Sequence, residues 1–237
     1  MNKQEVKGLL FAFQNKILIY FAARNLSTKQ PIQMQFLGNY YSGYWFPENL
    51  INSSGTIWGV GLGFDSSFER ELETRGFKIF GFEPDSRASA HAVTEFMGTN
   101  SEIFPWGLWD RNGNFESFGS SISIVDIFDK RIGNHDSLEI RDIYETATSL
   151  ELDQQSKPRV LKLNIEGAER EILLGLVSNP LDFEVIIFQA EFLLHLGFFK
   201  FLKKYRATRQ LRKILQGLAS HGYDLKHIGR NQFTLVK

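Results

Sequence analysis

The chain has 237 residues, of which 43% are hydrophobic, 14% aromatic and 23% charged. This composition excludes a disordered chain, and the length favours one domain with an appendage over two independent domains. The sequence has no cysteine, which excludes disulfides, thiolate-bound metal centres and a cysteine nucleophile.

The charges cancel overall but are unevenly distributed along the chain. Residues 1–30 carry a net charge of +4 and residues 192–237 carry +9, whereas residues 31–191 carry −13. An acidic body with basic ends argues against a protein that grips nucleic acid along its whole length. It leaves open a local contact with an anionic partner.

The first apolar segment is Leu9–Ala23, which is interrupted by Gln14, Asn15 and Lys16. It is too short and too polar to span a bilayer, which takes about 20 apolar residues. The pattern predicts an amphipathic helix packed on the domain, with an interfacial membrane helix as the alternative. No small-residue cleavage site follows, so no secretory signal is predicted. We therefore expect a cytoplasmic protein, with peripheral contact at the inner membrane face left open.

From residue 55 onward, strand and helix signals alternate. Strands are predicted at Thr56–Gly61, Phe77–Phe82, Glu102–Trp109, Val160–Ile165 and Glu184–Ala190, and helices at Ser66–Arg75, Ala88–Phe96, Glu169–Val177 and Phe198–Ser220. A hairpin turn is predicted at Asp110–Gly113, and a closing hairpin at Tyr223–Ile228 and Gln232–Val236. The pattern leaves most of residues 114–159 unassigned. The alternation predicts a parallel sheet with helices on both faces.

The most informative motif is the glycine turn Gly59-Val60-Gly61-Leu62-Gly63, which lies between a strand and a helix. Glycines there allow a tight turn and a close approach of the backbone to a ligand, and the helix beyond offers free N–H groups. Glu83 follows 20 residues later, at the end of the next strand. In a doubly wound sheet that position lies beside the first glycine loop, where a carboxylate accepts ribose hydroxyls. A purely structural turn is the alternative.

The spacing of the turn discriminates among nucleoside cofactors. A dinucleotide fingerprint requires a third glycine three places after the second, but the two possible registers place Phe64 or Ser66 there. No Gly-Lys-Ser/Thr follows, which excludes a P-loop. Asp65 puts a negative charge where a pyrophosphate would lie, and that charge suits the ammonium of a methionine moiety. The turn therefore favours S-adenosylmethionine.

Several sequence blocks in order resemble the FkbM family of S-adenosylmethionine-dependent methyltransferases. The blocks are SGYWFPENL (42–50), GVGLGFDSSFERELETRG (59–76), FGFEPD (80–85), WGLWDRNGNF (106–115), LKLNIEGAEREIL (161–173) and the terminal hairpin. The resemblance runs from residue 40 to the C-terminus. It divides the chain into a helical N-terminal extension, residues 1–39, and a methyltransferase domain, residues 40–237.

The resemblance implies an α/β, class I methyltransferase (Rossmann-like) fold. Its sheet has seven mostly parallel strands, an antiparallel C-terminal hairpin and helices on both faces. The implied reaction is methyl transfer to a hydroxyl, with a saccharide as the expected acceptor. The alternatives are a polyketide, lipid or small-metabolite acceptor, or a non-catalytic homologue that binds a glycan or a partner. The residues implied to bind the cofactor are Gly59, Gly61, Gly63, Asp65, Ser67, Phe68 and Glu83.

The candidate catalytic residues follow the fourth and fifth strands. The family's Asp-x-Glu-Gly block is Asn164-Ile165-Glu166-Gly167 here, so an amide replaces the first acid. An alcohol acceptor must lose its proton, and Glu166 and Glu191 are the candidate bases, with His195 third. The competing readings are a helix cap for Glu166, a solvated acid for Glu191 and a packed ring for His195. The histidines show no metal-ligand spacing, so no metal site is predicted.

Two surface features remain. Residues 198–213 carry seven basic residues and no acid, which indicates a solvated helix face or a docking surface for an anionic acceptor or lipid headgroup. The aromatic residues of segment 40–46 offer stacking faces to a sugar, cover the cofactor or pack in the core.

Overall fold

The computed structural model describes residues 3–24, 26, 31–116, 137–150, 157–165, 167–194, 201–229 and 231–237, and all structural statements refer to these. Two candidate bases from the sequence, Glu166 and His195, lie outside the described residues.

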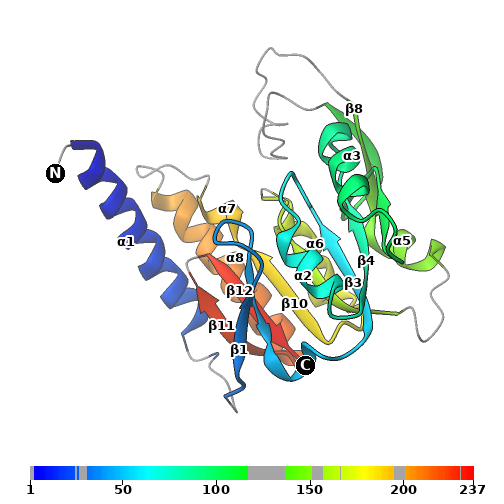
Figure 1. Cartoon of the computed structure of the whole chain (residues 1–237). Coiled ribbons are helices and arrows are strands. Elements are labelled where there is room, and N and C mark those ends of the chain that lie inside the picture. Colours follow the sequence, from blue (N-terminus) through cyan, green and yellow to red (C-terminus); the bar gives the residue numbers. More distant parts are fainter. Residues whose placement is uncertain are drawn as a thin grey trace.

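The central element is a seven-stranded sheet in the order β11-β12-β10-β9-β3-β4-β5 (Figure 1). Its strands are β3 (Gly55–Val60), β4 (Phe77–Phe82), β5 (Glu102–Phe104), β9 (Pro158–Leu163), β10 (Val185–Gln189), β11 (Asp224–Gly229) and β12 (Gln232–Val236). Neighbours from β10 to β5 run parallel, and β12 is antiparallel to both β10 and β11. The fold expected of a class I methyltransferase is thereby confirmed.

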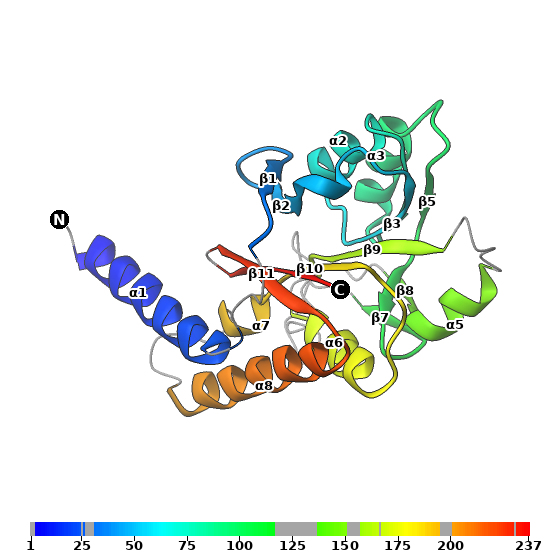
Figure 2. The same cartoon turned by 90° about the horizontal axis from the view of Figure 1, so that it is seen from below.

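The sheet is covered on both faces because its strands are apolar on both faces. Along β3, Ile57 points into one core and Trp58 into the other, as alternation along a strand requires. The hairpin of β1 (Met34–Leu37) and β2 (Tyr44–Pro47) covers one face together with α2 (Ser67–Glu73) and α3 (Ser86–Glu95). The other face is covered by α6 (Glu169–Ser178), α7 (Glu191–Leu194) and α8 (Phe201–Ser220), as Figure 2 shows.

The predicted strand Glu102–Trp109 is wrong as a single strand. Pro105 separates β5 from β6 (Gly107–Trp109), because proline has no N–H to donate to a sheet ladder. β6 belongs to a second sheet of order β6-β8-β7. The turn predicted at residues 110–113 therefore does not join paired strands.

The second sheet lies in the segment that sequence patterning left unassigned. It contains β7 (Gly113–Glu116) and β8 (Ser137–Asp142), with β8 parallel to β6 and antiparallel to β7. The helix α5 (Ile143–Ser149) follows β8 directly. Asp142 caps it by accepting hydrogen bonds from the backbone N–H groups of Tyr144 and Glu145.

The N-terminal helix α1 (Lys3–Ala23) packs along α8. Lys204 Nζ donates to Gln14 Oε1 at 2.9 Å and to Asn15 Oδ1 at 3.0 Å, and Arg212 donates to the Phe21 carbonyl at 3.2 Å. These three hydrogen bonds join residues 14 and 15 to 204 and residue 21 to 212, so the helices run in the same direction. Lys204 is buried, so the reading of this basic segment as a solvated face is wrong for that residue.

The predicted boundary between residues 39 and 40 falls inside the β1–β2 hairpin, and α1 itself ends at Ala23. Within the described residues, no helix combines the length and apolar composition needed to cross a bilayer.

Candidate functional site

The glycine turn follows β3 at the point where the strand order reverses between β3 and β9. In open α/β sheets such a reversal, at the carboxyl ends of the strands, is where ligands bind. Gly61 and Gly63 have φ angles of 75° and 59°, in the left-handed region that favours glycine. A Cβ on Gly61 would lie 2.0 Å from the Asn164 carbonyl oxygen, whereas a Cβ on Gly63 would meet nothing within 4 Å. The turn therefore packs against the residue that follows β9 at Gly61, whereas the space beside Gly63 is unfilled.

At Gly59, close packing of neighbouring side chains explains the need for glycine. A Cβ there would lie 3.1 Å from Leu62 Cδ2 and 3.1 Å from Glu69 Cγ. Both side chains are buried, so they occupy the space that the missing Cβ leaves. The role of Gly59 towards a cofactor stays a prediction.

Glu83 lies beside the glycine turn, as the sequence predicts. Its side chain is 6% exposed, and its two carboxylate oxygens accept hydrogen bonds from the backbone N–H groups of Gly63 at 2.8 Å and Asp85 at 2.9 Å. Burial raises the pKa of Glu83 above its ordinary value, although these two N–H donors act in the opposite direction. The Glu83 carboxylate is therefore held against the glycine turn by two backbone hydrogen bonds.

The residues that open α2 connect the turn to the β1–β2 hairpin. The Asp65 carboxylate accepts hydrogen bonds from Asn39 Nδ2 and from the backbone N–H of Ser67. Burial acts to raise the pKa of Asp65. These hydrogen bonds and further hydroxyl donors outweigh it and hold the pKa below its ordinary value. The Ser67 hydroxyl accepts from the Asn39 N–H at 3.0 Å. These side chains therefore anchor the hairpin.

Phe68 requires a correction. Its side chain has no exposed surface and packs edge-on against Tyr44 and Phe46. The side chain belongs to the core beneath α2 because it lies on that helix's inward face, so it is not available to a cofactor.

Asn164 and Glu191 follow the ends of β9 and β10. The Asn164 N–H donates to the Val60 carbonyl at 3.0 Å, and its side chain is half-buried. Glu191 begins α7 and accepts a hydrogen bond from Asn231 Nδ2 at 2.9 Å. Glu191 is therefore hydrogen-bonded to the β11–β12 turn. The alternative reading places it as a solvated acid in a loop.

A buried ion pair behind the glycine turn was not singled out by the sequence analysis. Lys162 Nζ lies 2.9 Å from Glu69 Oε1 and donates to the Gly61 carbonyl at 2.9 Å. The two side chains are only 3% and 1% exposed. The sequence did contain a sign of this ion pair, which is the lysine inside the apolar strand VLKLN. A fully buried lysine requires a partner.

Further acids surround Tyr44 at the same end of the sheet. Burial, and then the charges of Glu69, Glu191 and Glu169, raise the pKa of Tyr44 well above its ordinary value. Glu169 has no exposed surface, and its carboxylate accepts from the N–H groups of Gly167 at 2.7 Å and Phe192 at 3.2 Å. Glu169 thus ties the loop after β9 to the start of α7.

We expect Glu169 to make the protein less stable as the pH rises from about 4.5 to about 7. Burial raises the pKa of Glu169 to about 7, so the folded chain binds a proton that the unfolded chain has released. The free energy of unfolding therefore falls with pH in this window, by at most about 1.4 kcal/mol per pH unit. Urea unfolding across this range should show a flatter profile for Glu169→Gln. The exposed control Glu48→Gln should keep the native slope, and equal slopes for all three proteins would contradict the assignment.

One hollow of the described structure lies away from these residues. It has a volume of about 700 Å³ and lies on the second sheet, where its lining includes Asn112, Glu139, Arg141 and Glu145. It contains none of the site residues expected from the sequence. Within the described part of the chain, no three His, Asp or Glu side chains are placed together as metal ligands.

Comparison with known proteins gives distant structural likenesses. No family model and no curated protein sequence matches the chain. Fibrillarin from Aeropyrum pernix, solved with bound S-adenosyl-L-methionine, is 9% identical over 90% of this chain and 86% of that chain, with a TM-score of 0.39. An O-methyltransferase from Bacillus cereus, solved with SAH, is 8% identical over 94% of this chain and 90% of that chain, with a TM-score of 0.39. At these scores, the fold assignment rests on the strand order described above.

Proposed function

We propose that the protein is an S-adenosylmethionine-dependent O-methyltransferase of the FkbM type that methylates a hydroxyl of a saccharide. The observation that carries the proposal is the contact between Glu83 and Gly63. It places a buried carboxylate against a glycine turn at the switch point of the sheet.

The residues present fit this cofactor at Glu83 and Gly63. When bound, S-adenosylmethionine supplies an electrophilic methyl group. Each carboxylate oxygen of Glu83 accepts one backbone N–H and retains a further acceptor site for a ribose hydroxyl. A Cβ on Gly63 would meet nothing within 4 Å, so the turn itself leaves room at this residue.

The acceptor side of the proposal rests on the carboxyl ends of β9 and β10. Glu191 is the described candidate for taking the proton from the acceptor hydroxyl, and Asn231 orients it through one hydrogen bond. Asn164 offers an amide at the tip of β9. Holding the hydroxyl in line with the transferred methyl group contributes several kcal/mol to catalysis by positioning alone.

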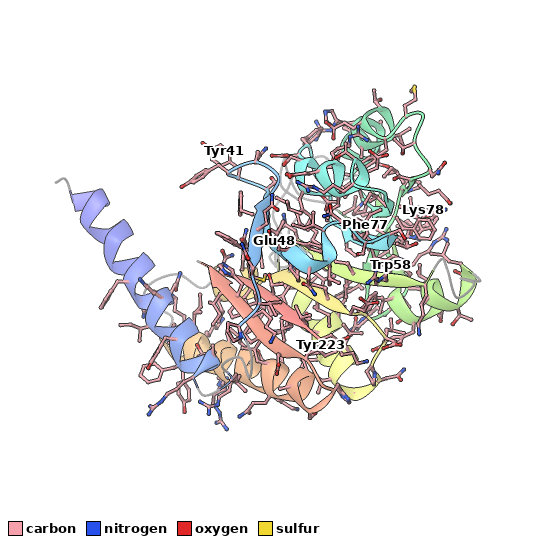
Figure 3. The ribbon with its side chains drawn as sticks, turned by 60° about the horizontal axis from the view of Figure 1, so that its bottom comes forward. Tyr41, Glu48, Trp58, Phe77, Lys78 and Tyr223 are labelled. Atoms are coloured by element: carbon pink, nitrogen blue, oxygen red, sulfur yellow. The ribbon has the colours of Figure 1, made fainter. Side chains whose placement is uncertain are left out.

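The saccharide assignment draws on the tip of the β1–β2 hairpin. Tyr40 and Tyr41 are 67% and 85% exposed, and their rings lie edge to face with centroids 5.3 Å apart. Figure 3 shows Tyr41 extending from the hairpin tip away from the body of the protein. Asn39 connects this tip to Asp65, two residues after the glycine turn. Exposed aromatic rings beside a candidate site indicate contact with a ligand.

The proposal predicts that the protein releases S-adenosylhomocysteine when given S-adenosylmethionine and a saccharide that it accepts. Product release should be measured across a panel of saccharides, polyketides and lipids. Tyr41→Ala should raise KM for the saccharide about fivefold without changing cofactor affinity, since stacking on one exposed ring contributes about 1 kcal/mol. Met97→Ala, at an exposed apolar residue outside the hairpin, should change neither value.

A second candidate function is a non-catalytic binding module, favoured by the amide of Asn164 where the family has an acid. Cofactor binding with no product release for any acceptor would favour this module over the enzyme. Product release only with non-saccharide acceptors would retain the enzyme and reject the saccharide.

A further inference from the structure

The outward face of α1 is apolar and exposed. Phe13 and Tyr20 are each 64% exposed, Phe21 is 50% and Ile17 is 39% exposed. These four residues, which we name the α1 stripe, lie on one side of the helix because they are spaced by three, four and seven or eight residues. A continuous exposed apolar stripe of this kind marks an interaction surface.

The stripe is not needed to attach α1 to the domain. The opposite side of the helix already buries Ile19, Ala22 and Ala23 in the main core. Lys204 and Arg212 hold the same helix through hydrogen bonds from α8. The attachment of α1 to the domain therefore does not explain why its outer face is apolar.

Basic residues border the stripe. On α1, Lys16 and Arg24 are exposed beside it. On α8, Tyr205, Arg209 and Arg212 are spaced by four and three residues and so share one side of that helix. The Arg212 contact with the Phe21 carbonyl places this side next to α1. Residues 13–24 and 201–220 contain no acidic residue.

We propose that the α1 stripe and the neighbouring basic side of α8 form one surface that docks the protein on an anionic lipid membrane. Phe, Tyr and Ile enter the boundary between headgroups and acyl chains, and the flanking Lys and Arg side chains pair with anionic headgroups. A second copy of the chain placed face to face on this surface would bring like charges together, so charge complementarity favours the lipid.

Vesicle flotation with the full chain tests the proposal. The protein should bind vesicles of phosphatidylcholine mixed with phosphatidylglycerol, bind vesicles of phosphatidylcholine alone more weakly, and lose affinity for the mixed vesicles as salt rises. Lys16→Gln combined with Arg209→Gln removes two exposed charges. It should lower partitioning to mixed vesicles about 25-fold, since each basic residue near an anionic surface contributes about fivefold. Phe13→Ser combined with Tyr20→Ser should lower it about tenfold or more.

Matched variants distinguish docking from general surface effects. Met97→Ser changes an exposed apolar residue that follows α3, and Arg87→Glu changes an exposed basic residue on α3. Both variants should bind vesicles as the native chain does. Circular dichroism checks that every variant is folded. Equal vesicle binding by native protein and stripe variants would overturn the proposal. So would absence of binding at low salt, or a dimer in analytical ultracentrifugation that the stripe variants convert to monomer.

Discussion

Replacing Lys162 by methionine is expected to lower the free energy of unfolding by about 3–5 kcal/mol. The substitution leaves Glu69 as an uncompensated charge at a site only 1% exposed, and it removes the donor to the Gly61 carbonyl. Urea unfolding followed by circular dichroism measures the effect. The expected size exceeds that of most single substitutions because both partners are removed from water.

Two companion variants separate the buried pair from ion pairs in general. Lys78→Met breaks the exposed pair with Glu102 and should cost less than about 1 kcal/mol. Glu69→Leu combined with Lys162→Met replaces both charges with apolar groups and should recover most of the stability lost by Lys162→Met alone. If Lys162→Met costs no more than Lys78→Met, the pair has no special role beneath the glycine turn.

Apart from β5, the sequence predicted the strands of the main sheet well because each is a short apolar segment bounded by glycine or a polar turn. For β4 the predicted and observed bounds coincide at Phe77–Phe82. The second sheet gave no such signal. β8 reads Ser-Leu-Glu-Ile-Arg-Asp, so only alternate residues are apolar, and its partners β6 and β7 are three and four residues long. Strands of this kind are defined by their neighbours more than by their own composition.

In the candidate site, too, some features could be predicted from the sequence and others could not. Glu83 and Gly63 were predictable because fold topology relates a strand end to the loop of the preceding strand. The contact of Lys162 with Gly61 joins residues 101 positions apart, and that of Asn39 with Asp65 joins residues 26 apart. Neither contact leaves a periodic pattern in the sequence. Phe68 was assigned by its place in a motif, but its side chain is directed into the core by its position on the inward face of α2.

The affinity for S-adenosylhomocysteine is expected to fall at least about a hundredfold in Glu83→Ala. The alanine removes both carboxylate oxygens that would accept the ribose hydroxyls, and each hydrogen bond to a charged group contributes about 1.5–3 kcal/mol. Isothermal titration calorimetry measures the change. Glu102→Ala, at an exposed acid on the neighbouring strand β5, should leave the affinity unaltered.

Glu83→Ala also removes the acceptor of the Gly63 and Asp85 N–H groups, so part of the lost affinity would come from a change in the local fold. A second ligand separates that part from the ribose contact. The native protein should bind the 2′-deoxy analogue of S-adenosylhomocysteine at least about tenfold more weakly than the parent compound, since the analogue lacks one of the two hydroxyl donors. Glu83→Ala should bind the two compounds equally, because its partner for that hydroxyl is gone. Such a cycle isolates the interaction between one side chain and one hydroxyl whatever else the substitution disturbs. If Glu83→Ala discriminates between the two compounds as strongly as the native protein does, Glu83 does not hold the ribose and the proposed cofactor site loses its main support.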